Sequence, residues 1–160
     1  MKTASLALPV LAVLVLSGCA VNGHIGAEST PTPTAFVASG TISVPIDISA
    51  TIAAQGGDGA TLGEACVSRD GYDDITSGAQ VVVSDASDKK VAIGDLGDGL
   101  LVKGPTGSTK LYESRCEYPF RIKDVPLGSK IYSVHAGNEA RGERSFTRGD
   151  LTDGIQLTIG

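Results

Sequence analysis

Short runs in which apolar and polar residues alternate constrain the fold of this chain more than any other feature. Apolar residues alternate with Thr, Ser, Pro or Asp over 41–49, and with Pro, Arg or Lys over 118–123. A period of two places one face of a strand in a core and the other in solvent. The 21 glycines and 7 prolines supply turns between such strands and disfavour long helices.

The pattern predicts about seven to nine short strands. The first is expected over 36–53, where Pro45 limits it to an edge or splits it at a bulge. Hairpins are expected between 79–84 and 89–94 and between 100–102 and 110–112, and further strands at 118–125, 131–135 and 155–159, with one helical turn within 145–153. Because the βαβ spacing of a parallel nucleotide-binding sheet is missing, we predict an all-β fold, a small antiparallel β-sandwich.

The N-terminus has the features of an export signal. Lys2 is the only charge before an apolar run over 4–16, which is shorter than the roughly twenty residues of a membrane span. The sequence Leu-Ser-Gly-Cys at 16–19 resembles the lipobox of bacterial lipoproteins at all four positions. The resemblance implies a diacylglyceryl thioether on Cys19 and cleavage just before it. An ordinary secretory signal with an accidental cysteine is the alternative.

We therefore expect three parts in the chain. Residues 1–18 are the predicted signal peptide, and residues 19–35 are the predicted lipidated Cys19 and a disordered tether, whose Thr-Pro steps favour extended backbone. Residues 36–160 are the predicted sandwich domain. A diacyl anchor would hold this domain at the outer face of the cell membrane, in the cell envelope, without a transmembrane helix.

The remaining two cysteines, Cys66 and Cys116, form an even pair in a chain with an export signal. We expect a disulfide between them that closes about fifty residues and contributes about 4 kcal/mol on the chain-entropy model. Two free thiols are the alternative, and a cysteine nucleophile is disfavoured because neither cysteine has a histidine nearby in sequence.

Several stretches resemble one group of small exported proteins. They are Gly-Tyr-Asp-Asp-Ile at 71–75 with 78–85, the segment 91–96, and Cys-Glu-Tyr-Pro-Phe at 116–120 with 124–128 and 132–134. Together they resemble exported proteins and lipoproteins of mycobacteria and related actinobacteria over roughly residues 64–160. That group has no established activity, so the resemblance implies a compartment and a shape.

The strand pattern is also similar to transthyretin-like and Cna-B-like sandwich repeats. In these, a strand runs into a Pro-Gly turn, here at 126–128, and the next strand supplies an inward tyrosine, here Tyr132. The resemblance implies an Ig-like or transthyretin-like sandwich. The glycine-rich interval 94–117 departs from the pattern and leaves the strand order open.

Two long, glycine-rich loops, 55–77 and 94–115, carry clustered aspartates. The candidate binding residues are Asp70, Tyr72, Asp73 and Asp74 in the first loop and Asp95 and Asp98 in the second. Loops carried at the end of a rigid sandwich often hold binding residues. The aspartates match no EF-hand spacing, so we interpret them as solvated and expect no metal and no cofactor. The charged residues over 141–150 are interpreted as a wet surface in the same way.

No complete catalytic constellation is visible, so we do not expect an enzyme. His135 stands without a Gly-x-Ser-x-Gly elbow, and 18 acidic against 13 basic residues, a net charge of −5, disfavour nucleic acid as a partner. We expect a non-enzymatic binding or structural module whose partners are the lipid bilayer, through Cys19, and an envelope or host protein. A small envelope hydrolase or ligand carrier, and a phage-derived lipoprotein that blocks superinfection, are the alternatives.

Overall fold

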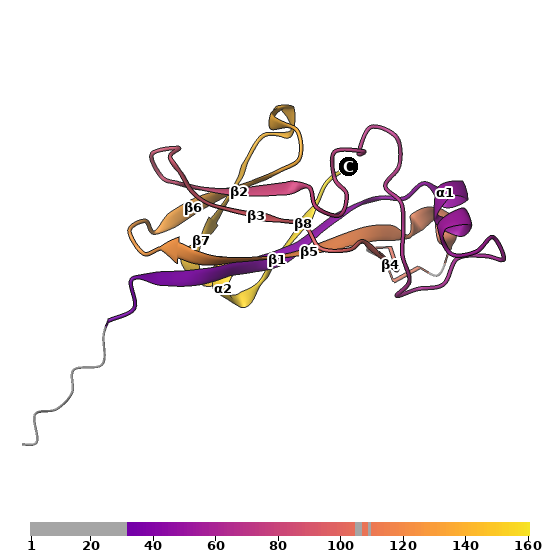
Figure 1. Cartoon of the computed structure of the whole chain (residues 1–160), viewed down its shortest axis with the longest axis horizontal. Helices are drawn as coiled ribbons and strands as arrows, with labels where there is room; N and C mark the ends of the chain where they lie inside the picture. Colours follow the sequence, from indigo (N-terminus) through magenta and orange to yellow (C-terminus); the bar gives the residue numbers. More distant parts are fainter. Residues whose placement is uncertain (1–31, 105–106, 109) are drawn as a thin grey trace, which may run out of the picture. The chain divides into compact units, whose positions relative to one another are not determined.

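Two four-stranded β-sheets face each other in the computed structural model, which describes residues 32–104, 107–108 and 110–160 (Figure 1). The strands are β1 (Ala35–Pro45), β2 (Gln80–Asp85), β3 (Lys90–Asp95), β4 (Leu100–Val102), β5 (Arg115–Pro126), β6 (Ile131–Ala136), β7 (Arg144–Thr147) and β8 (Ile155–Thr158). One sheet has the order β4–β5–β1–β8 and the other β3–β2–β6–β7. The prediction of an all-β sandwich is therefore confirmed. All strand pairings within these sheets are antiparallel except that of β1 with β8.

The core between the sheets is mainly aliphatic, and β5 shows most clearly how the sequence builds it. Its inward residues Cys116, Tyr118, Phe120 and Ile122 are all buried, while the residues between them are exposed or half-buried. This confirms the period-two prediction for the strand. The facing sheet contributes Val81, Val83, Tyr132, Val134 and Ala136.

The predicted strand over 36–53 is only partly correct, because β1 ends at Pro45 and Ile48–Ala54 form helix α1. Asp47 caps this helix: its carboxylate accepts a hydrogen bond of 2.8 Å from the backbone N–H of Ala50. Pro45 donates no backbone hydrogen bond, which suits the end of a strand. The alternation that suggested a longer strand continues to Ile48 by coincidence, and in the helix Thr51 is the buried residue.

The predicted hairpin between 100–102 and 110–112 is wrong. β4 pairs with the start of β5, so that Leu101 lies opposite Cys116, and Leu111–Glu113 form a short 3-10 helix, η1. Gly104 explains part of this path, since a Cβ at that position would collide with the backbone carbonyl of Glu113. The hairpin of β2 and β3, by contrast, is confirmed.

The C-terminal segment crosses from one sheet to the other. After β7, helix α2 (Arg148–Asp153) begins with a capping box in which the side chains of Thr147 and Asp150 bond each other's backbone N–H groups. This agrees with the expected helical turn. β8 then lies parallel to β1, with Gly40 opposite Ile155. A Cβ at Gly40 would lie 2.5 Å from the Ile155 carbonyl oxygen, so glycine permits this close pairing.

Tyr132 points inward, as expected, and fixes the turn between β5 and β6. Its hydroxyl donates to the carbonyl of Pro126 at 2.6 Å, and its ring lies edge-on to Phe36 at 5.2 Å between centroids. Separately, no helix within the described ranges has the length and apolar character needed to cross a membrane.

Candidate functional site

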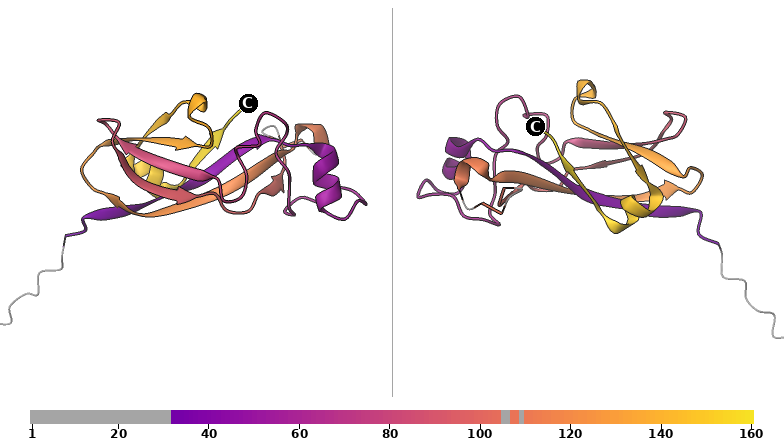
Figure 2. Two further views of the ribbon diagram at one scale, coloured as in Figure 1. Left: turned by 45° about the horizontal axis from the view of Figure 1, so that its top comes forward. Right: turned by 180° about the vertical axis from the view of Figure 1, so that it is seen from behind.

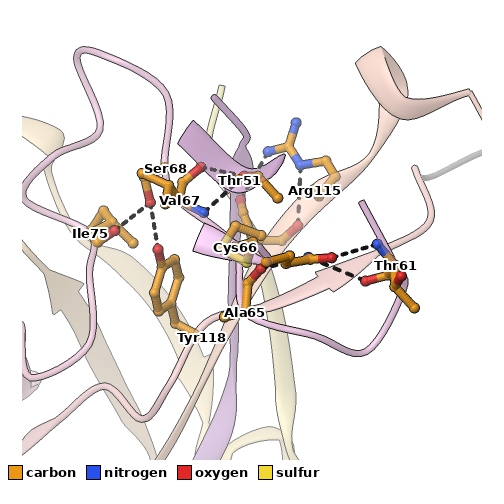
Figure 3. Close-up of a disulfide and its surroundings, with 12 residues drawn as sticks. Thr51, Thr61, Ala65, Cys66, Val67, Ser68, Ile75, Arg115 and Tyr118 are labelled. Carbon is orange, nitrogen blue, oxygen red and sulfur yellow. Dashed lines mark hydrogen bonds between the residues drawn. A yellow bond between two sulfur atoms is a disulfide. The ribbon is translucent and has the colours of Figure 1, made fainter. Parts of the chain in front are cut away.

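The long loop, which we define as residues 55–79 between α1 and β2, is attached to the sandwich by a disulfide. Cys66 in this loop is bonded to Cys116 on β5, with the Cα atoms 5.7 Å apart and a sequence separation of 50 (Figure 3). The predicted disulfide is thus present. Because Cys116 is fully buried on an inner strand, the bond anchors irregular backbone directly to the core.

Side-chain hydrogen bonds hold the long loop at further points. The hydroxyl of Ser68, which is buried, donates to the carbonyl of Ile75 at 2.6 Å and lies 2.8 Å from the hydroxyl of Tyr118 (Figure 3). The side chain of Gln55 donates to the carbonyl of Ala65 at 2.7 Å. The contacts of Ser68 give a buried hydroxyl the partners that buried polar groups require. Figure 2 shows the loop beside α1 at the end of the sandwich where β1 ends.

An ion pair joins the long loop to the turn between β6 and β7, which contains the 3-10 helix η2 (Glu139–Arg141). The carboxylate of Asp74 accepts from Nε of Arg141 at 2.6 Å, from Nη2 of the same guanidinium, and from the backbone N–H of Asn138 at 2.7 Å. Arg141 also donates to the carbonyl of Gly71 at 2.6 Å. Gly137, at φ +69°, lies so close that a Cβ would collide with the Asp74 carboxylate. The pair therefore depends on glycine at that position.

The ring of Tyr72 contacts two cations. The guanidinium carbon of Arg141 lies 4.8 Å from the ring centroid, and that of Arg69 lies 5.9 Å from it. Cation–π contacts at these distances are attractive. Tyr72 therefore adds a further contact between the long loop and η2.

A solvent-open hollow of about 640 Å³, which we call the loop hollow, lies where these segments meet. It is lined by Gly71, Asp73 and Asp74 from the long loop, by Asn138, Ala140 and Arg141 from the turn between β6 and β7, and by Ile159. The carboxylate of Asp73 is exposed and accepts a hydrogen bond of 3.3 Å from Gly71. The hollow thus offers one exposed carboxylate beside a fixed ion pair.

The structure brings some of the candidate residues together and separates others. Tyr72, Asp73 and Asp74 gather at or beside the loop hollow, and Asp70 is exposed on the same loop. Asp98 accepts from the hydroxyl of Ser77 at 2.8 Å, which connects the two predicted loops. Asp95 instead ends β3.

Arg141 is the partner that the sequence analysis missed. Its side chain is 18% exposed, so the interpretation of 141–150 as a wet surface is wrong for this residue. Its partner Asp74 is 67 residues away in sequence, and a local pattern cannot reveal such a pairing.

His135, considered as a base in the sequence, is a buried residue of β6. Its ring nitrogens lie 3.1 Å and 3.0 Å from the carbonyl oxygens of Gly142 and Gly137. These contacts brace the turn that carries Arg141. Among the residues that the structure describes, no group of three or more His, Cys, Asp or Glu side chains could hold a metal ion.

Comparison of the chain with protein-family models, curated proteins and solved structures finds no match. The likeness to mycobacterial lipoproteins and to transthyretin-like domains therefore stays a prediction. Cys19 and the predicted signal peptide lie outside the described residues.

The Asp74–Arg141 pair makes the stability of the fold depend on pH. Chiefly through the side-chain hydrogen bond from Arg141, the pKa of Asp74 is lowered from 3.8 to about 2. A carboxyl whose pKa falls on folding stabilises the native state above its unfolded pKa, and this contribution is lost as pH falls from 3.8 towards 2. After allowance for solvent screening, we expect the free energy of unfolding to fall by about 1 kcal/mol over this range.

The measurement is denaturant unfolding at several pH values for the native protein, Asp74→Asn and Asp73→Asn. The loss of unfolding free energy on acidification should be smaller by about 1 kcal/mol in Asp74→Asn than in the native protein. It should be unchanged in Asp73→Asn, because that carboxylate is exposed. Equal acid dependence in all three proteins would contradict the stabilising role of the pair.

Proposed function

We propose that this chain is a lipid-anchored protein of the cell envelope whose sandwich domain is a non-enzymatic binding module. The observation that carries the proposal is the fixation of the long loop. Its irregular backbone is held by the Cys66–Cys116 disulfide, by Ser68, and by the Asp74–Arg141 pair. Loops that are already ordered lose less conformational entropy on binding, and rigid scaffolds often present binding residues in this way.

The anchor is supported by the sequence at 16–19, since the lipobox resemblance makes Cys19 the acceptor of lipid. Residues 20–34 separate that cysteine from β1. Fully extended, this segment spans at most about 50 Å. A domain on such a tether reaches partners in the envelope or at the cell surface while staying attached to the bilayer.

The residues at the loop hollow favour a protein partner. Tyrosine and arginine are enriched in protein interfaces, and here Tyr72 and Arg141 are held in contact. Asp73 adds an exposed carboxylate that a basic group of a partner can pair with. We therefore propose that an envelope or host protein binds at this end of the sandwich.

Site-specific photo-crosslinking tests this proposal in the cells that export the protein. A photo-reactive phenylalanine analogue in place of Ala140, which is exposed and lines the loop hollow, should yield a discrete crosslinked product. The same analogue in place of Lys123, which is exposed on β5 near its end at Pro126, should not. The control shares the anchor and the fold, so only the loop hollow distinguishes the two positions.

Two results would contradict the proposal. One is an identical crosslinking pattern at both positions. The other is esterase, peptidase or glycosidase turnover by the purified full-length protein that His135→Ala or Asp73→Ala abolishes while the circular dichroism spectrum is unchanged. That second result would establish an envelope hydrolase.

A further inference from the structure

A second hollow, distinct from the loop hollow, brings two arginines together. It has a volume of about 470 Å³, and we call it the arginine hollow. It is lined by Arg69 of the long loop, Arg115 at the start of β5, and Pro45, Tyr112, Glu113, Ser114 and Gly160. The lining therefore carries two positive side chains and one acidic side chain, that of Glu113.

Arg115 is held rigidly in this hollow by backbone and side-chain acceptors. Its Nη2 donates to the carbonyls of Ser43 at 2.9 Å and Ile159 at 2.6 Å, and its Nε donates to the Ser43 hydroxyl at 3.2 Å. None of these acceptors carries a negative charge. The guanidinium is thus fixed in position while its charge remains available to a ligand.

The two guanidinium groups repel each other. Burial lowers the pKa of Arg115 below its ordinary value, and the charge of Arg69 adds to that lowering, while Tyr72 and Glu117 oppose it. The salt bridges among the described residues are Lys90–Glu139 and Asp74–Arg141, so neither arginine of this hollow has a carboxylate within 4.0 Å. A bound anion would offset both the repulsion and the cost of burying Arg115.

Tyr112 forms part of the rim of the hollow. It is 66% exposed, and the ammonium group of Lys110 lies 5.6 Å from its ring centroid. Lys110 does not itself line the hollow. The exposed ring also offers a flat apolar surface to whatever carries the anionic group.

We propose that the arginine hollow binds a phosphate group through the guanidinium groups of Arg69 and Arg115. The planar fork of donors on a guanidinium matches the oxygens of phosphate and bonds them more strongly than neutral donors do. The phosphate can belong to a soluble molecule or to a phospholipid headgroup, which share this chemistry. The inference does not depend on the proposed protein partner, because it concerns a different hollow.

The test uses the full-length protein in neutral detergent micelles, observed by NMR. Inorganic phosphate is added at constant ionic strength, balanced with chloride, and in a second series phosphatidylglycerol is added to the micelles. We expect saturable shifts of the backbone signals of Arg69, Ser114 and Arg115. Saturation with inorganic phosphate supports a soluble ligand, and saturation with the phospholipid alone supports a headgroup. Saturation with neither overturns the proposal.

Variants separate a specific site from general attraction of anions. Arg69→Gln should weaken phosphate binding by about tenfold, the effect of one charge-assisted contact. Arg121→Gln is the matched control, because Arg121 is exposed on the same strand as Arg115 but does not line the hollow. Equal affinity in the native protein and Arg69→Gln, with both proteins folded by circular dichroism, overturns the proposal.

Discussion

Replacing Cys66 and Cys116 together by alanine is expected to destabilise the protein by about 4 kcal/mol. The disulfide joins residues fifty positions apart, so its loss releases a long loop in the unfolded chain and raises the entropy of that state. Cys116 is fully buried, and the smaller alanine also leaves space in the core. Such a loss is large beside the roughly 5–15 kcal/mol of total stability that is typical of a domain.

Denaturant unfolding of the oxidised protein and of the double alanine variant measures this difference. Mass spectrometry of non-reduced peptides should show Cys66 linked to Cys116. Alkylation of both thiols without reductant, under native and denaturing conditions alike, would contradict the disulfide. A variant as stable as the oxidised protein would contradict its energetic role.

Strands with one buried face were the part of the fold most open to prediction. In β5, every second residue from Cys116 to Ile122 is buried. The alternation of apolar and polar side chains in the sequence therefore indicates directly which residues face the core. β2 and β3 are joined by a short turn, and a local hairpin of this kind needs no information from elsewhere in the chain.

The errors fell where a local pattern has two physical solutions. The apolar residues up to Ile48 fit a strand, but a cap at Asp47 starts a helix at that position. The pairing of β4 with β5 instead of 110–112 depends on contacts over longer distances, among them the close approach of Gly104 to Glu113. Sequence alternation alone carries no information about such contacts.

The candidate site was predictable in part for the same reason. The acidic loop with Asp73 and Asp74 stood out in the sequence, because its charges are adjacent. Arg141 did not, because only the folded chain brings it to Asp74. Arg69 and Arg115 likewise meet only at the arginine hollow, where strand β5 and the long loop come together.

If the proposed lipid anchor exists, Cys19→Ala is expected to remove it and the membrane attachment that it provides. Alanine has no thiol to form the thioether that the lipobox resemblance implies. Two acyl chains hold a protein stably on a bilayer, whereas a single chain gives only marginal binding, so loss of the diacylglyceryl group removes the main source of affinity. The double alanine variant of Cys66 and Cys116 is the matched control, since it removes two cysteines and leaves this one in place.

The most direct measurement is incorporation of a labelled fatty acid by the cells that produce the protein, followed by partitioning of the protein between detergent and water. The native protein and the Cys66→Ala, Cys116→Ala control should carry the label and enter the detergent phase. Cys19→Ala should carry no label and stay in the aqueous phase. Unchanged partitioning of Cys19→Ala into the detergent phase would contradict a lipid anchor at Cys19, and with it the proposal of a membrane-tethered module.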